Sequence, residues 1–149
     1  MDTLKIYVAS SWRNPHQLEV VRALREKRFE VYDFRQPVPG DNGFHWSEID
    51  REWKTWNVPN YVQQLQHPLA EDGFNKDFGA MKWADCCVLV LPCGRSAHLE
   101  AGWFVGAGKP CIIYYPPGVN VEPELMNKMC TDIVDNIDAL VHALEKSRS

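Results

Sequence analysis

The sequence predicts an α/β protein built on a doubly wound parallel sheet of about five strands, with helices on both faces. Short β-rich runs alternate with segments of helical periodicity, which is the pattern of β-α units. The run at residues 86–91 is almost continuously apolar, as expected of a parallel strand that is covered on both faces. A length of 149 residues fits one such sheet, so we expect a single domain over residues 1–149.

Five strands are expected in chain order. Each is a short run of β-branched, aromatic or other apolar residues. The runs cover residues 4–9, 29–33, 86–91, 111–115 and 131–134. Strands that alternate with helices in this way form the sheets of Rossmann-like and flavodoxin-like proteins, which bind ligands beyond the carboxyl ends of their strands. We therefore expect the functional site to follow the first and third strands.

Helices are expected between the strands and at the end of the chain. Apolar residues at spacings of three and four mark their buried faces. These stripes are Leu18, Val21 and Leu24 in the first helix, Phe74, Phe78 and Met81 before the third strand, and Ile137, Leu140, Val141 and Leu144 in the last helix. Ser96 is expected to cap a further helix that runs to about Gly106, and Asn136 or Asp135 to cap the last one.

An aromatic-rich insertion at about residues 35–70 interrupts the alternation. It contains Trp46, Trp53 and Trp56, and short helices are expected at about residues 47–56 and 60–66. Spacings of seven and three fit one buried helical stripe, but a nucleobase also needs a flat apolar surface to stack on. Core packing and base stacking both remain open, with Trp46 as the stacking candidate.

Composition excludes several classes of function. A net charge of −4 leaves no sequence-wide basic field to attract a nucleic-acid polymer. No apolar run approaches the roughly 20 residues that cross a bilayer, and the N-terminus lacks a signal-peptide pattern, so we expect a cytoplasmic protein with no membrane partner. Five cysteines without C-x-x-C spacing argue against a zinc site or a disulfide framework. We expect reduced, mostly buried thiols and no metal.

Glu100 is the residue that most clearly indicates chemistry. It follows the turn after the third strand, near the start of a helix, where the helix dipole favours an ionised carboxylate and free N–H groups can hold an anion. An ionised glutamate suits nucleophilic attack on an anomeric carbon. Asp77, at the edge of a buried helix face, is a candidate general acid. The plainer alternative for both is an acidic residue that only complements a helix dipole.

Three sequence blocks resemble the nucleoside 2-deoxyribosyltransferase-like superfamily, which includes the transferases and the nucleoside 5′-monophosphate N-glycosidases. The blocks are residues 5–13, residues 75–78, and residues 97–103 together with 108–110. The resemblance implies that Glu100 is the nucleophile that forms a glycosyl-enzyme intermediate. It also implies that Asp77 assists protonation of the leaving group and that Tyr7 orients the nucleophile, although an ordinary packed strand tyrosine is the alternative for Tyr7.

The resemblance also implies a set of substrate contacts. Ser11 and Arg13 match positions that contact the 5′-phosphate in the monophosphate hydrolases, and Arg binds phosphate oxygens bidentately. Trp12, beside them, is a stacking candidate. Ser96 is a further phosphate contact or a cap alone, and His98 resembles a histidine of the cytidylate-cleaving branch or is an exposed residue without function.

Several positions depart from the family pattern. Asn14 and Pro15 stand where the monophosphate hydrolases have a Gly-rich turn, Gly94 replaces a polar residue, and residues 145–149 lack the terminal Asn and aromatic pattern of the transferases. These differences weakly favour hydrolysis over transfer, and a phosphorylated substrate over a free nucleoside.

The sequence thus predicts an N-glycosidase or deoxyribosyltransferase that acts on a small nucleoside or nucleotide without a cofactor or metal. Relatives form dimers or larger oligomers, so a homodimer or higher homo-oligomer is expected. The alternatives are a non-catalytic nucleotide-binding or sensing module and an enzyme that cleaves NAD. The base, the choice between ribose and deoxyribose, and the subunit count are left open.

Overall fold

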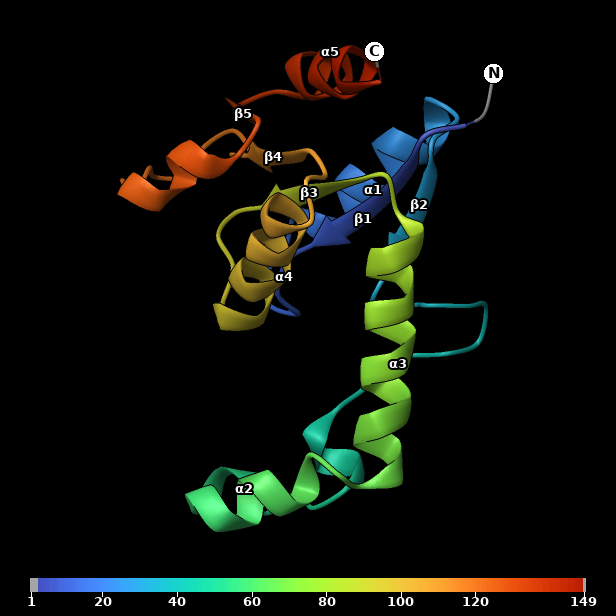
Figure 1. Cartoon of the computed structure of the whole chain (residues 1–149), viewed down its shortest axis with the longest axis vertical. Coiled ribbons are helices and arrows are strands. Elements are labelled where there is room, and N and C mark those ends of the chain that lie inside the picture. The colour runs from blue at the N-terminus through green and yellow to red at the C-terminus, as the bar shows by residue number, and fades with distance from the viewer. Residues whose placement is uncertain (1–2, 149) are drawn as a thin grey trace. The chain divides into compact units, whose positions relative to one another are not determined.

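The computed structural model describes residues 3–148, which contain one five-stranded parallel sheet (Figure 1). Its strands are β1 (Lys5–Ala9), β2 (Glu30–Asp33), β3 (Cys86–Val90), β4 (Cys111–Tyr114) and β5 (Asp132–Val134). They lie in the order β2-β1-β3-β4-β5, and each neighbouring pair is parallel. This is the strand order of flavodoxin-like proteins, so the predicted fold class is confirmed.

The chain forms two compact units. One comprises the residues up to Asp33 and from Met81 onward, and the other is Phe34–Ala80. The first unit holds the sheet with α1 (Gln17–Glu26), α4 (Arg95–Gly106), the 3₁₀ helix η3 (Leu125–Met129) and α5 (Ile137–Ser147). The second unit holds the 3₁₀ helices η1 (Trp46–Glu48) and η2 (Trp53–Thr55), then α2 (Val58–Gln64) and most of α3 (Pro68–Trp83).

Helices cover both faces of the sheet. On one face, Leu24 of α1 and Leu144 of α5 belong to the same buried cluster as Val8 and Val88 of the central strands. On the other face, the ring centroid of Phe104 in α4 lies 5.7 Å from that of Tyr7 in β1. Val8 and Tyr7 are neighbours whose side chains point to opposite faces, as the period of two along a strand requires. Burial on both faces explains the almost unbroken apolar sequence of β3.

The switch in strand order between β1 and β3 positions the site. β1 pairs with β2 on one side and with β3 on the other, and Ala9 at the end of β1 stands beside Leu89 near the end of β3. The loops that follow β1 and β3 therefore leave the sheet at the same edge, at the topological switch point where doubly wound proteins bind ligands.

Two predicted stripes need correction. The buried face of α1 is formed by Gln17, Val20, Val21 and Leu24, whereas Leu18 is exposed. The helix begins at Gln17, and residues three, four and seven positions later share its face, which leaves Leu18 on the solvent side. Phe74 is also exposed, at 61%, and stacks on Phe78, while Met81 is buried as expected. The cap of α5 is confirmed, because Asn136 accepts a hydrogen bond from the Ala139 amide.

The predicted helix at residues 47–56 is wrong. Only η1 and η2 form there, separated by the turn around Asp50. The Asp50 carboxylate accepts hydrogen bonds from the Glu52 amide and from the Trp56 indole. Such local bonds from an aspartate to nearby donors compete with a continuous helix. The helix expected at about residues 60–66 exists as α2, two residues earlier.

Aromatic side chains form the core of the second unit. The ring of Trp46 lies edge-on to Phe44, Trp56 and Tyr61, with centroids 4.8, 5.7 and 6.0 Å away. Edge-to-face pairs at these distances are favourable beyond the area that they bury. Gly73 allows the approach, because a Cβ there would lie 2.9 Å from the Cβ of Phe44. Trp46 and Trp56 therefore pack against other aromatic residues of this unit.

Lys109 closes the end of α3 within the first unit. Its ammonium group donates to the carbonyl oxygens of Met81, Lys82 and Ala84 at 3.1, 2.8 and 2.7 Å. It also lies over the rings of Trp103 and Phe104 in α4. The last carbonyls of a helix have no partner within the helix, and a cation there also complements the helix dipole. One side chain thus joins the end of α3 to α4.

Replacing this cation should destabilise the fold. Lys109→Met keeps most of the side-chain volume but leaves three carbonyl groups without their donor, so we expect the free energy of unfolding to fall by about 2 kcal/mol. Urea denaturation followed by circular dichroism measures the change. Lys128→Met, at an exposed lysine, is the control and should stay within about 0.5 kcal/mol of the native protein. Equal stabilities for the two variants would contradict the role given to Lys109.

Candidate active site

A buried tyrosine and a glutamate meet at the switch point of the sheet. Tyr7 is fully buried in β1, and its hydroxyl donates a hydrogen bond to the Glu100 carboxylate. Glu100 is half-buried on α4, the helix that follows β3. Hydrogen bonds to an ionised acceptor are shorter and stronger than neutral ones. The carboxylate is thereby held in one orientation by a side chain that cannot itself move.

The helix dipole stabilises the ionised Glu100 carboxylate less than the sequence predicts. The N-cap of α4 is Gly94, and Ser96 is exposed and makes no cap hydrogen bond, so the predicted Ser96 cap is wrong. The turn after β3 continues to Gly94, whose extended backbone lets the helix start at Arg95. Glu100 consequently lies beyond the first turn, where the dipole effect has fallen off. The hydrogen bond from the Tyr7 hydroxyl therefore orients this carboxylate more than the helix dipole does.

The loop after β1 carries the predicted substrate contacts. Ser11 is half-buried, while Trp12 and Arg13 are exposed at the same edge of the sheet. Arg13 is exposed on this loop, which Asn14 bonds to the carboxyl end of β3. A planar cation in that place is suited to a phosphate group.

His98 lies on the first turns of α4, close to the turn that precedes the helix. Its Nδ1 donates to the Gly94 carbonyl at 2.9 Å and lies 3.7 Å from the Cys93 sulfur. Its ring is exposed, so Nε2 can face a ligand. The predicted site residues named so far all belong to the first unit. Ser11, Trp12 and Arg13 follow β1, and Ser96 and His98 lie in the first turn of α4. Tyr7 is the central residue of β1, and Glu100 lies further along α4.

Asp77 and Trp46 belong to the second unit. Asp77 is half-buried in the interior of α3, which begins at Pro68. Because the helix starts more than two turns earlier, the alternative of an acid that complements the N-terminal dipole does not hold for Asp77. Trp46 is half-buried in the aromatic core described above.

The sequence analysis did not identify Asn14 and Ser10 as residues that connect the loops of the first unit. Asn14 is only 2% exposed, and its amide donates to the carbonyl oxygens of Val90 and Pro92 at 3.1 and 2.9 Å. The Ser10 hydroxyl also donates to Val90, at 2.9 Å. The one available signal was an asparagine directly before a proline at the start of a helix, a position that favours side-chain hydrogen bonds to nearby backbone.

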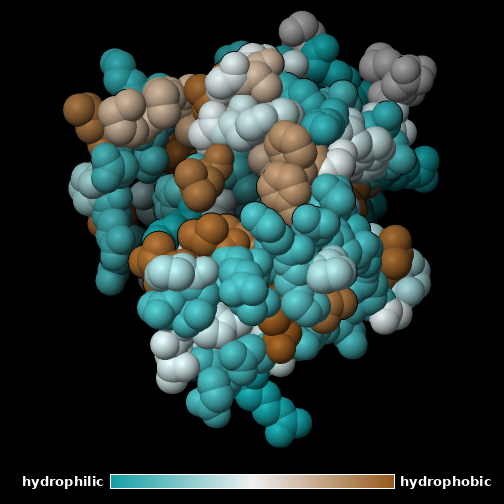
Figure 2. Space-filling model, turned by 60° about the horizontal axis from the view of Figure 1, so that its bottom comes forward, coloured by the Kyte–Doolittle hydropathy of each residue, from teal (hydrophilic) through white to brown (hydrophobic). Residues whose placement is uncertain are grey.

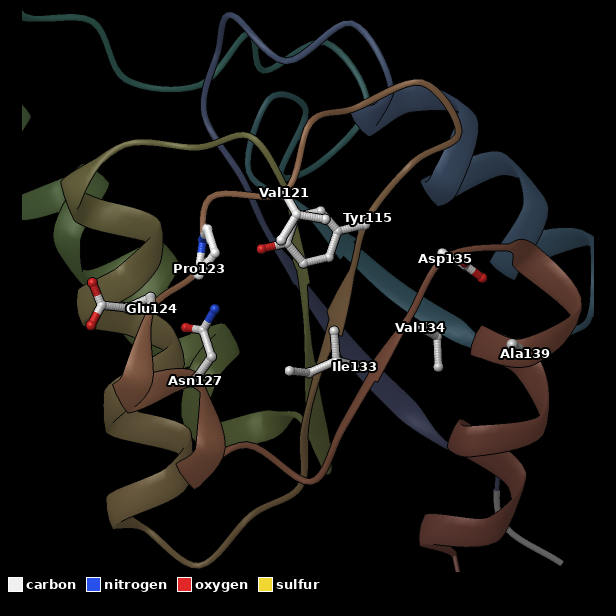
Figure 3. Close-up of a pocket in the computed structure, with 9 residues that line it drawn as sticks. All are labelled: Tyr115, Val121, Pro123, Glu124, Asn127, Ile133, Val134, Asp135 and Ala139. Carbon is white, nitrogen blue, oxygen red and sulfur yellow. The ribbon is translucent and has the colours of Figure 1, made fainter.

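A hollow opens at the same edge of the sheet but away from these residues. It has a volume of about 560 Å³ and lies at the ends of β4 and β5, between the segment 121–127 and the start of α5. Figure 3 shows the ring of Tyr115 beside Val121, with Asn127 and Ile133 close by. Neither Tyr7 nor Glu100 lines it, so it is distinct from the site described above.

Within residues 3–148, no group of three or more His, Cys, Asp or Glu side chains is arranged to hold a metal ion. The same part of the chain contains no helix long and apolar enough to cross a bilayer. All five cysteines are free thiols, and Cys86, Cys87 and Cys111 are buried while Cys93 and Cys130 are half-buried. The expectation of reduced, mostly buried thiols is confirmed.

Solved structures show where this architecture occurs. A 2-deoxyribosyltransferase from Bacillus psychrosaccharolyticus is similar with a TM-score of 0.62 and 21% sequence identity, over 91% of this chain and 89% of that one. A protein from Enterococcus faecalis V583 is similar with a TM-score of 0.58 and 12% identity, over 97% and 99%. A CMP N-glycosidase from Clostridium botulinum, BcmB, has a TM-score of 0.46 and 16% identity, over 95% and 98%.

The likenesses to the first two of these structures define the class of fold. The chain has the α/β fold of the 2-deoxyribosyltransferase, which is an enzyme of the kind that the sequence blocks resemble. No family model matches the sequence, and no curated protein is significantly similar to it. The fold implied by the resemblance is confirmed.

The charge of Glu100 should be measurable at Cys93. Burial, and secondly the nearby Glu100 carboxylate, raise the pKa of the Cys93 thiol to about 12. Because the thiolate is the reactive form, alkylation by iodoacetamide should accelerate about tenfold per pH unit from about pH 8 to about pH 10 without reaching a plateau. Glu100→Gln removes the negative charge, so the pKa falls and alkylation at a fixed pH becomes faster.

Peptide mass spectrometry follows this reaction at each cysteine separately. Cys87 and Cys111 are fully buried and serve as internal controls that should remain unmodified in both proteins. A plateau below about pH 10, or identical rates in the native protein and Glu100→Gln, would contradict an ionised Glu100 beside Cys93.

Proposed function

We propose that this protein cleaves the N-glycosidic bond of a nucleoside or nucleoside 5′-monophosphate, with Glu100 as the nucleophile. The observation that carries the proposal is the hydrogen bond from the buried Tyr7 hydroxyl to the Glu100 carboxylate at the switch point of the sheet. A carboxylate that is half-buried and held by a hydrogen bond is suited to act as a nucleophile at a sugar carbon. The fold shared with a 2-deoxyribosyltransferase supports the same chemistry.

The reaction needs two steps. A Glu100 oxygen attacks the anomeric carbon, and the bond from that carbon to the base nitrogen breaks with its electron pair leaving on the base. Asp77 is proposed to protonate the departing base. Water then attacks the same carbon of the glycosyl ester, Asp77 accepts its proton, and Glu100 leaves as a carboxylate, which gives net retention. Transfer to a second base replaces water in the same scheme.

Groups at the edge of the sheet are proposed to hold the substrate. Arg13 and Ser11 bind the 5′-phosphate, with Ser96 as a further contact from the first turn of α4. Trp12 offers an exposed ring for stacking, and His98 a ring nitrogen for the base. The alternative is that these residues have only structural roles or are solvated. We also propose that the protein forms a homodimer or higher homo-oligomer and that it is cytoplasmic.

The decisive experiment is a screen of nucleosides and nucleoside monophosphates for release of free base. Glu100→Gln should lower kcat/KM by about 10³-fold or more, because the amide cannot form the glycosyl ester. Chromatography of the free base measures turnover. Glu122→Gln, at an exposed carboxylate on the loop after β4, should keep native activity. Binding of nucleotides without release of any base would instead indicate a non-catalytic module, and release of nicotinamide from NAD alone would indicate the third alternative.

The role of Asp77 is tested by the dependence of kcat on the pKa of the leaving base. If Asp77 protonates the base, Asp77→Asn should lower kcat by about 10²-fold for a natural base and far less for a synthetic base whose nitrogen has a low pKa. Asp72→Asn, five residues earlier on α3 and exposed, is the control. An equal loss for both classes of leaving group would remove Asp77 from the proton transfer while leaving Glu100 in place.

A further inference from the structure

We propose that Asn14 is a positioning residue, which fixes the loop with the substrate contacts to the turn that leads into the helix of Glu100. This inference rests on the proposed function. Asn14 follows β1, and its amide donates to Val90 at the end of β3 and to Pro92 in the turn after it. Its side-chain oxygen accepts a hydrogen bond from the His16 amide at 2.7 Å. These three bonds join two backbone segments, the start of α1 at His16 and the stretch from Val90 to Pro92.

An asparagine is specifically required by this arrangement. The bond to His16 uses the side-chain oxygen, and the bonds to Val90 and Pro92 use both N–H groups of the amide. Of the short side chains, only Asn offers an acceptor and two donors in one plane. Since Asn14 is 2% exposed, water cannot easily replace a lost bond. The Val90 carbonyl would keep its bond from Ser10, so loss of the bond to Pro92 is the larger effect on the link between the loops.

The position of Asn14 links it to both halves of the site. The backbone N–H of Asn14 donates to the Ser11 carbonyl at 3.1 Å, which closes the turn that contains Trp12 and Arg13. Pro92 begins the turn that ends at Gly94, the N-cap of α4. A shift of either loop would move Arg13 relative to Glu100. Small errors of about 1 Å in such geometry are enough to lower a reaction rate about 10²-fold.

This role also accounts for the departure from the family pattern at Asn14 and Pro15. A Gly-rich turn binds a ligand through its own backbone N–H groups, whereas here the turn is held by a side chain from within. The loop is thus expected to be fixed before the substrate binds, and Arg13 to be the group on it that contacts a phosphate.

Asn14→Asp is the sharpest test, because it keeps the shape of the side chain and removes the two donors. We expect kcat/KM for a nucleoside monophosphate to fall by about 10²-fold at about pH 8. Burial and the facing carbonyl oxygens raise the pKa of the introduced carboxyl, and the protonated form can again donate one bond. The ratio of variant to native kcat/KM should therefore rise as the pH falls toward about 5, which a space-filling role would not produce.

Ser10→Ala is the matched control. It removes another buried bond to the same Val90 carbonyl but does not reach Pro92, so its kcat/KM should stay within about threefold of the native value. A native-like Asn14→Asp, a variant with no recovery at low pH, or an equal loss in Ser10→Ala would each overturn the proposal.

A second measurement does not depend on activity. Amide hydrogen exchange of residues 91–99 should become at least about tenfold faster in Asn14→Ala than in the native protein. Urea denaturation of the variant should still show a cooperative transition, which establishes that the chain is folded under the conditions of the exchange measurement. Unchanged exchange overturns the link between the loops, and its acceleration supports it. Absence of base release by the native protein defeats the proposed function alone, so the two failures are distinguishable.

Discussion

The parallel pairing of β1 with β3 is the constraint on which the rest of the structure depends. It places Tyr7 beside Cys87 and Ala9 beside Leu89, so that two loops far apart in the sequence leave the sheet together. The hydrogen bond to Glu100, the two bonds to the Val90 carbonyl and the bond to Pro92 all cross between these strands or their loops. Since the strands are buried on both faces, their register is fixed, and so is the frame of the site.

The sheet could be predicted from the sequence because its signals are local. Apolar runs marked all five strands to within one residue, and the alternation with helices indicated a parallel sheet. The second unit could not be predicted as well, because its structure depends on contacts between aromatic residues separated along the chain, such as Trp46 with Tyr61. The spacing of Trp46, Trp53 and Trp56 fits one helical stripe, but the structure has two separate 3₁₀ turns there, and the Asp50 carboxylate between them bonds to Trp56. A side chain that bonds to its own neighbourhood has no periodic signature.

The candidate site was predicted in part for a similar reason. Tyr7 and Glu100 lie in recognisable blocks, and the structure brings them into contact. Ser96 was predicted as the cap because serine is a common N-cap residue. The prediction was wrong because the helix begins two residues earlier, with Gly94 as its N-cap. Asn14 was read only as a departure from a pattern. Its function as a link depends on Val90 and Pro92, more than seventy positions away in the sequence, and no local pattern reports such a contact.

The source of the charge stabilisation at Glu100 has a chemical consequence. A helix dipole would favour the anion wherever the carboxylate points, but the Tyr7 hydroxyl favours it in one orientation only. In the proposed reaction this bond weakens when Glu100 becomes a neutral ester and strengthens again as the carboxylate leaves. Tyr7 therefore makes the free carboxylate a somewhat weaker nucleophile and a better leaving group. Such a balance suits an intermediate that must both form and break down. A carboxylate without a stabilising hydrogen bond would be a poor leaving group, so the glycosyl ester would accumulate.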